Sequence, residues 1–203
     1  LDNNATTPLR KAAMTEMLSA MGPPANPSSV HGFGRNARLL VESARESVAT
    51  LAGCHPANVV FTSGGTESNN LVLAQYEHLI TSAIEHDSVR HAHDRCQVIG
   101  VDANGIIDLD KLAATISMID DMVKPNTIIS VMAANNETGV LQPIEKIAEM
   151  ACSSNLAFHS DMVQVFGKKH LDFTNSEISY ASFSAHKIGG PTGVGALLVR
   201  PGC

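Results

Sequence analysis

The sequence predicts an open α/β fold, in which short buried strands alternate with helices. Two patterns support this expectation. The first is a set of short apolar or β-branched runs, each closed by a polar residue or a glycine, which is typical of buried strands. These runs cover residues 58–63, 79–84, 127–134, 156–160 and 178–184. The second is the helical spacing of apolar residues between several of the runs.

The helical patterns have recognisable starts and stops. We expect helices over residues 8–21, 34–52, 108–116 and 143–153. Proline is common near a helix start and glycine at a helix end, which places Pro8 at the opening of the first helix and Gly53 at the end of the second. Cys96 precedes a connecting strand, and a last strand runs up to Val199.

Each of the five predicted strands ends in residues that carry chemical groups. In order, the ends are Gly64-Gly65-Thr66, Glu85-His86, Asn135-Asn136-Glu137, Asp161 and Lys187. Open α/β sheets bind ligands in a crevice outside the carboxyl ends of their strands. Groups far apart in the chain are therefore expected to meet at one ligand.

Lys187 is the most informative of these residues, because it follows a strand and precedes the Gly189-Gly190 turn. A lysine in a partly dry pocket can lose its proton and attack an aldehyde, as a Schiff-base lysine does. The aldehyde we expect is pyridoxal 5'-phosphate. The ordinary alternative for any lysine is a solvated surface charge, so the prediction depends on the other strand ends.

The turn Gly64-Gly65-Thr66 leads from a strand into a helix and suits a phosphate. Glycines allow a close approach to the backbone, and the free N–H groups of a first helical turn face an anion. An ordinary helix N-cap is the alternative. The segment contains neither a P-loop nor a dinucleotide-binding glycine pattern.

Asp161, Gln164 and His86 have roles that suit the same cofactor. A carboxylate at Asp161 can keep a pyridine nitrogen protonated, which makes the ring an electron sink. Gln164 can bond the phenolic oxygen, and His86 can stack on the ring or move protons. The alternatives are a helix N-cap for the aspartate and a structural role for the histidine.

Seven motifs, in this order, resemble those of cysteine desulfurases of the NifS/IscS branch, which are class V, fold-type I, pyridoxal-phosphate enzymes. They are LDNNATTP, NPSSVH, FTSGGTESNN, SAIEH, NNETGV, HSDMVQ and SAHKIGGPTGVGAL. The resemblance implies a three-layer α/β/α large domain with a mostly parallel sheet, covering residues 1–203. It also implies that the small C-terminal domain, which carries the catalytic cysteine loop, is absent from this chain.

The resemblance implies a role for each matching residue. Lys187 would carry the cofactor, and His86 would stack on its ring and take part in catalysis. Asp161 would pair with the ring nitrogen, Gln164 with the phenolic oxygen, and Asn136 would lie near the cofactor and the substrate carboxylate. Phosphate contacts would come from Gly65, Thr66, Ser184 and His186.

The same resemblance implies an activity and partners. The enzyme would be a homodimer that removes sulfur from L-cysteine, releases L-alanine and passes a persulfide to iron–sulfur scaffold or thiolation proteins. Other class V enzymes, such as a selenocysteine lyase or an aminotransferase, share the cofactor apparatus. A catalytically incompetent cofactor-binding fragment is the alternative from another class. Cys203 matches the connection that leaves the large domain, so we do not expect it to be the nucleophile.

Composition narrows the function classes further. The 203 residues are 44% hydrophobic with a net charge of -6, which gives a sizeable core and no basic surface for nucleic acid. The apolar runs are too short to span a bilayer, and the start lacks a signal-peptide pattern, so no membrane partner and a cytoplasmic location are expected. Cysteine and histidine spacings match no metal site.

Overall fold

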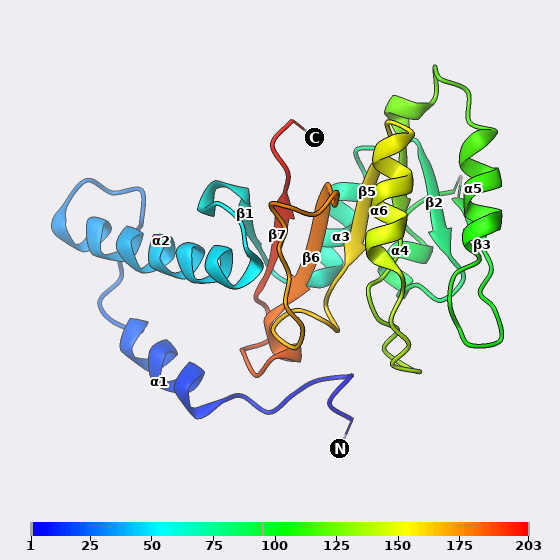
Figure 1. Cartoon of the computed structure of the whole chain (residues 1–203). Coiled ribbons are helices and arrows are strands. Elements are labelled where there is room, and N and C mark those ends of the chain that lie inside the picture. Colours follow the sequence, from blue (N-terminus) through cyan, green and yellow to red (C-terminus); the bar gives the residue numbers. More distant parts are fainter. Residues whose placement is uncertain (1, 95, 203) are drawn as a thin grey trace.

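The structure is a computed structural model that describes residues 2–94 and 96–202. These residues build one seven-stranded sheet, in the order β1-β7-β6-β5-β4-β2-β3 (Figure 1). The strands are β1 (Val59–Thr62), β2 (His78–Ser82), β3 (Cys96–Ile99), β4 (Thr127–Ser130), β5 (Ala157–Asp161), β6 (Tyr180–Ser184) and β7 (Gly195–Val199). All neighbouring strands are parallel except β7, which is antiparallel to both β1 and β6. The predicted α/β fold with a mostly parallel sheet is confirmed.

Helices cover both faces of the sheet, which makes three layers (Figure 1). The helices are α1 (Lys11–Ala20), α2 (Gly32–Ala52), α3 (Gly65–Leu73), α4 (Asp87–Arg90), α5 (Leu109–Ser117) and α6 (Ile144–Ser153). Helices α3 and α4 pack with one core cluster, and α5, α6 and the end of α2 pack with the other. The sheet is therefore buried on both faces.

Neighbouring residues of a strand supply the two cores alternately. Ile128 belongs to the cluster under α3, whereas Ile129 belongs to the cluster under α6. Leu197 and Leu198 divide in the same way on β7. Successive side chains of a strand point to opposite faces, so a continuous apolar run is needed when both faces are covered. Each such side chain contributes roughly 1.5–3 kcal/mol when fully buried.

A polar row interrupts the core under α3. His159 is fully buried on β5, and its ring nitrogens lie 2.8 Å from the hydroxyls of Ser130 on β4 and Ser182 on β6. Burial lowers the pKa of His159 to about 3, so the ring is neutral in the folded chain. Two hydroxyl partners satisfy both nitrogens, which removes most of the cost of burying them.

Most expected boundaries differ from the structure by one or two residues, and the two larger differences have identifiable reasons. The strand predicted over 127–134 ends at Ser130, because the Met132 N–H turns to the carboxylate of Glu85 at 2.9 Å. The helix expected from Pro8 begins at Lys11, because the Thr7 N–H donates to the His186 carbonyl and extends the chain there. The antiparallel insertion of β7 between β1 and β6 was not predicted.

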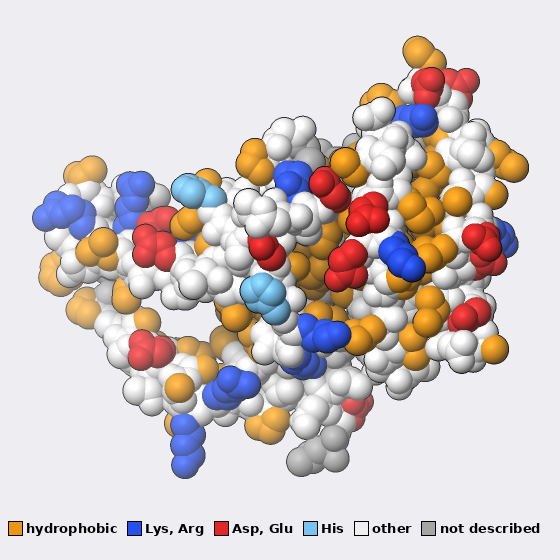
Figure 2. Space-filling view, in the orientation of Figure 1, with side chains coloured by type: hydrophobic (Ala, Val, Ile, Leu, Met, Phe, Trp, Pro, Cys, Tyr) orange, Lys and Arg blue, Asp and Glu red, His pale blue; other side chains and the backbone are white. Residues whose placement is uncertain are grey.

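The N-terminal arm, defined here as residues 11–46, extends away from the sheet (Figure 1). Every residue of α1 is at least partly exposed, and the residues that α2 buries are Gly34, Ala49 and Ala52. Large apolar side chains therefore remain exposed on the arm, visible as orange patches in Figure 2. Within the described chain, no helix has the length and hydropathy needed to cross a membrane.

Candidate cofactor site

A cavity of about 390 Å³ lies at the carboxyl ends of the parallel strands. Because β1 runs in the same direction as β6, the ends of β1, β2, β4, β5 and β6 share this edge of the sheet. All of the residues that the sequence predicted for the site line the cavity. They are Gly65, Thr66, His86, Asn136, Asp161, Gln164, Ser184, His186 and Lys187. Residues from separate strand ends therefore meet in one cavity.

The glycine turn between β1 and α3 forms one wall of the cavity. Within the described chain, no side chain caps the first turn of α3, so its N–H groups remain available. A Cβ on Gly65 would lie 2.7 Å from Val163 Cγ2, and one on Gly195 would lie 2.5 Å from Gly64 Cα. Only glycines allow this close packing. The turn has the geometry of an anion-binding helix start.

Ser184 and His186 lie beside this turn, at the end of β6. The Ser184 hydroxyl is 2.8 Å from His186 Nδ1, and a Cβ added at Gly64 would lie 3.7 Å from the same hydroxyl. Partial burial, and then the charge of Lys187, lower the pKa of His186. The uncapped helix start and these two side chains together provide donors of the kind that bind phosphate.

Asp161 ends β5 and is only 6% exposed. Its carboxylate accepts hydrogen bonds from Asn69 Nδ2 at 2.8 Å and from the Val163 N–H at 3.0 Å. Burial nevertheless raises the pKa of Asp161, although those bonds and the positive groups of His86 and Lys187 act in the opposite direction. A buried carboxylate with few compensating charges suits a cationic N–H partner in the cavity.

Lys187 lies in the short 3-10 helix Ala185–Lys187 that follows β6. Its ammonium donates to the carbonyl of Asn4, and partial burial lowers its pKa. The carboxylates of Asp161 and Asp2 oppose that shift. Desolvation increases the fraction of free amine, which is the form that attacks a carbonyl carbon.

The N-terminal strap, defined here as residues 2–10, crosses the mouth of the cavity. Asp2, Asn4 and Ala5 line the cavity, and the Asn4 carbonyl also accepts from Gln164 Nε2 at 2.9 Å. Gln164 Oε1 is buried and has no hydrogen-bond partner among the described residues. The sequence placed Asn4 in a matching motif but did not predict it as a site residue.

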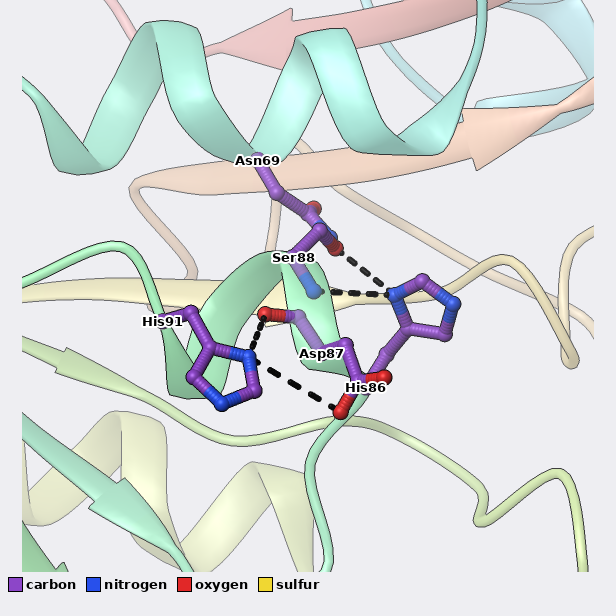
Figure 3. A network of polar contacts seen from close by, with 5 residues as sticks. All are labelled: Asn69, His86, Asp87, Ser88 and His91. Atoms are coloured by element: carbon purple, nitrogen blue, oxygen red, sulfur yellow. Dashed lines mark hydrogen bonds and ion pairs between the residues drawn. The ribbon is translucent and has the colours of Figure 1, made fainter.

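His86 follows the end of β2 and is exposed toward the cavity. Its Nδ1 lies 2.8 Å from the hydroxyl of Ser88 (Figure 3). The same hydroxyl accepts a hydrogen bond from Asn69 Nδ2 at 2.9 Å. Asn69 and Ser88 were missed by the sequence reasoning. The available signals were the position of Asn69 within the FTSGGTESNN motif and the position of Ser88 at the helix start after His86.

Two further polar residues support the cavity from β2 and β4. Glu85 is 5% exposed, and burial raises its pKa to about 8, against the hydrogen bonds from Ser82 and from the Met132 N–H. Asn136 donates to Glu137 Oε1 at 2.7 Å, and its carbonyl accepts from Asn4 Nδ2 at 3.1 Å. Glu85 thus fixes the chain that leads to His86, and Asn136 fixes the strap.

Among the described residues, the cavity has no cysteine thiol in its lining and no cluster of side chains that could bind a metal ion. Cys54, Cys96 and Cys152 are free, and the residues lining the cavity include none of them. Cys203 lies outside the described residues. Within the described chain, no cluster of histidine, cysteine and carboxylate side chains could hold a metal ion.

The residues present fit pyridoxal phosphate in three separate places. The uncapped start of α3 suits the phosphate, Asp161 suits a protonated ring nitrogen, and Lys187 suits the aldehyde. The unpartnered Gln164 Oε1 shows a polar atom that nothing in the described chain satisfies. A group with a hydroxyl at that position would supply the missing donor.

Comparisons with known proteins agree with this geometry. Residues 1–202 match the family model described as Aminotransferase class-V. The chain is 38% identical to "Cysteine desulfurase IscS" of Dictyoglomus turgidum, covering 100% of this chain and 54% of that protein. It is also 38% identical to "Cysteine desulfurase, mitochondrial" of Saccharomyces cerevisiae, covering 98% and 42%.

Solved structures show the same fold. A NifS-like protein from Rickettsia africae superimposes with a TM-score of 0.92 at 35% identity, covering 98% of this chain and 57% of that one. "SspA in complex with cysteine" superimposes with a TM-score of 0.87 at 34% identity, covering 98% and 60%. The chain therefore spans about half the length of the curated relatives it matches.

The raised pKa of Asp161 predicts how the cofactor-free chain responds to pH. In the unfolded chain the carboxyl ionises near pH 3.9, whereas the folded chain holds its proton to higher pH. The contribution of Asp161 to stability should therefore fall as pH rises above about 4. Asp161→Asn removes this loss, so the melting temperature of the variant should exceed that of the parent at pH 8. The difference should be about 2–4 °C for each kcal/mol of unfolding free energy that the parent loses.

Thermal unfolding at pH 4 and pH 8 measures this difference, with the exposed Asp110→Asn as the control. Pyridoxal phosphate should stabilise the parent more than Asp161→Asn, because only the carboxylate gains a charged partner. Equal stabilisation of the two proteins by the cofactor would contradict the assigned role of Asp161.

Proposed function

Because the chain belongs to the class-V aminotransferase family, we propose that it is the cofactor-binding part of a pyridoxal-phosphate-dependent cysteine desulfurase. The family depends on pyridoxal phosphate. The observation that carries the proposal is the meeting of Lys187, Asp161 and the uncapped start of α3 in one cavity. Residues 1–203 correspond to the large domain in this proposal.

Each end of the cofactor has a place in the cavity. Gly65, Thr66, Ser184 and His186 would hold the phosphate, and Asp161 would face the ring nitrogen. His86 would lie against the ring, and Gln164 would reach the phenolic oxygen. When bound, pyridoxal phosphate supplies an aldehyde for the substrate amine and a ring that accepts electrons from the substrate's Cα.

The chain's own residues orient the substrate and move protons. Lys187, whose pKa is lowered by partial burial, is placed to hold the cofactor and then to move a proton at the substrate's Cα. Asn136 also lines the cavity, where it would orient the substrate carboxylate. Asp2, Asn4 and Ala5 of the strap line the cavity, where they would limit access of water.

The choice of L-cysteine as substrate is supported by the relatives. Two of them are named cysteine desulfurases, and a third similar structure is described as a complex with cysteine. The cofactor residues alone are equally compatible with other amino acids. Sulfur would leave the substrate only by attack of a thiolate, and the described cysteines lie away from the cavity.

A homodimer is supported by the N-terminal arm. Leu18, Phe33 and Leu39 are 62%, 62% and 67% exposed, and they belong to a larger exposed apolar set on the arm (Figure 2). Exposed apolar surface of this extent is typical of an interface. We propose a second copy of the chain as its partner, as the sequence resemblance implies.

Downstream partners and location stay predictions. Iron–sulfur scaffold or thiolation proteins would accept the sulfur, and the sequence predicts a cytoplasmic location. The relatives include bacterial, mitochondrial and mitosomal proteins, so they do not single out one compartment.

The first test concerns Lys187. After incubation with pyridoxal phosphate and reduction with borohydride, peptide mapping should find the pyridoxyl group on Lys187, because its amine faces the cavity and is partly desolvated. Lys187→Ala should lose the label, and Lys169→Ala should keep it. A label mainly on Lys168 or Lys169 would rule out Lys187 as the cofactor lysine.

The second test concerns sulfur release. We expect the 203-residue chain, loaded with pyridoxal phosphate, to produce no more sulfide from L-cysteine than free pyridoxal phosphate does. The reason is the absence of a described thiol at the cavity. Sulfide production that disappears in Cys203→Ser would contradict this expectation and identify that cysteine as the nucleophile.

The third test concerns the arm. Analytical ultracentrifugation should show a dimer that Leu18→Glu combined with Leu39→Glu weakens at least about tenfold, since charges would be placed in a buried apolar contact. Met118→Glu is the matched control, because Met118 is 83% exposed and lies outside the arm. Unchanged association in the double variant would exclude the arm as the interface.

A further inference from the structure

The side chains of Asn69 and Ser88 connect two of the proposed cofactor residues. Asn69 Nδ2 lies 2.8 Å from Asp161 Oδ2 and 2.9 Å from the Ser88 hydroxyl. The Ser88 hydroxyl lies 2.8 Å from His86 Nδ1 (Figure 3). A continuous chain of hydrogen bonds therefore runs from Asp161 to His86.

The direction of each bond follows from the donors available. An amide nitrogen carries two hydrogens, which match its two acceptors, Asp161 and Ser88. The opposite orientation of the Asn69 amide would place its oxygen against the Asp161 carboxylate, where two acceptors would repel. Asp161 therefore fixes the amide, although Asn69 Oδ1 is left buried and without a partner among the described residues.

The same reasoning fixes the imidazole of His86. Since the Ser88 hydroxyl already accepts a hydrogen from Asn69, its own hydrogen is free to point to His86 Nδ1. The Ser88 backbone N–H also points to Nδ1, at 3.2 Å, and an N–H can only donate. Nδ1 must then carry the lone pair, which leaves the proton of the neutral ring on Nε2.

His91, four residues beyond Asp87, has the opposite surroundings. Its Nδ1 lies 3.2 Å from the Asp87 carbonyl oxygen, which can only accept, so His91 should carry its proton on Nδ1 (Figure 3). The two neighbouring histidines differ because Ser88 supplies donors to one and a carbonyl supplies an acceptor to the other.

We propose that Asn69 and Ser88 are positioning residues that hold the neutral ring of His86 with its proton on Nε2. In this form Nε2 has no lone pair, so it cannot take a proton from a ligand. Loss of its proton would create an imidazolate. His86 is thus a fixed hydrogen-bond donor beside the cofactor, and proton movement is left to Lys187. The use of this donor rests on the proposed function, whereas the tautomer does not.

Nitrogen-15 NMR of the histidine rings in the cofactor-free full chain tests the assignment. The spectra are recorded at pH 8.5, well above the ordinary imidazole pKa of about 6.5. His86 should show a higher ratio of Nε2–H to Nδ1–H than the exposed His170, which serves as the internal reference. Ser88→Ala should lower that ratio about fivefold, the factor that one ordinary hydrogen bond represents.

Matched variants separate positioning from a general disturbance. Ser88→Thr keeps the hydroxyl and should keep the parental ratio. Asn70→Ala removes an exposed amide next to Asn69 on α3 and should also leave the ratio unchanged. A ratio for His86 equal to that of His170, or a parental ratio in Ser88→Ala, would overturn the proposal. Because the cofactor is not needed, failure of the proposed enzyme activity would not affect this result.

Discussion

The carboxylate of Asp161 is the constraint on which the site depends. It is buried at the end of β5, yet among the described residues its direct donors are one amide and one backbone N–H. A buried charge with so little compensation is unfavourable unless a cationic partner occupies the cavity. The position of Asp161 therefore suits a cationic partner in the cavity, and burial, the same physical cause, raises the pKa of the carboxyl.

The sheet topology brings the other groups to this carboxylate. Parallel strands end at one edge, so His86, Asn136 and Lys187 approach from β2, β4 and β6 without long connections. The antiparallel β7 carries Gly195, which allows the glycine turn between β1 and α3 to pack against it. The strap then contacts the cavity residues, because the Asn4 carbonyl accepts from Lys187 and the Asn4 side chain donates to the Asn136 carbonyl.

Much of this arrangement could be predicted from the sequence, because the apolar strands and the polar residues at their ends are both local features of the chain. Buried strands require continuous apolar runs, and each of the five predicted strand ends supplies at least one residue that lines the cavity. The strap and the insertion of β7 could not be predicted, since both depend on pairing between distant segments, such as Thr7 with His186. Asn69 was missed for another reason: an asparagine inside a helix usually faces solvent, and only the tertiary structure turns this one to Asp161.

The two histidines near the cavity show how donors decide the use of a side chain. His159 lies two residues before Asp161 on β5, between two hydroxyls that satisfy both of its ring nitrogens, and its role is structural. His86 has one nitrogen satisfied from Ser88 and presents the other to the cavity. The hydrogen bond from the Ser88 backbone cannot be reversed, so it favours the same tautomer as the hydroxyl does. The same carboxylate that would hold the cofactor ring thus also orients, through Asn69, the group that would lie on its face.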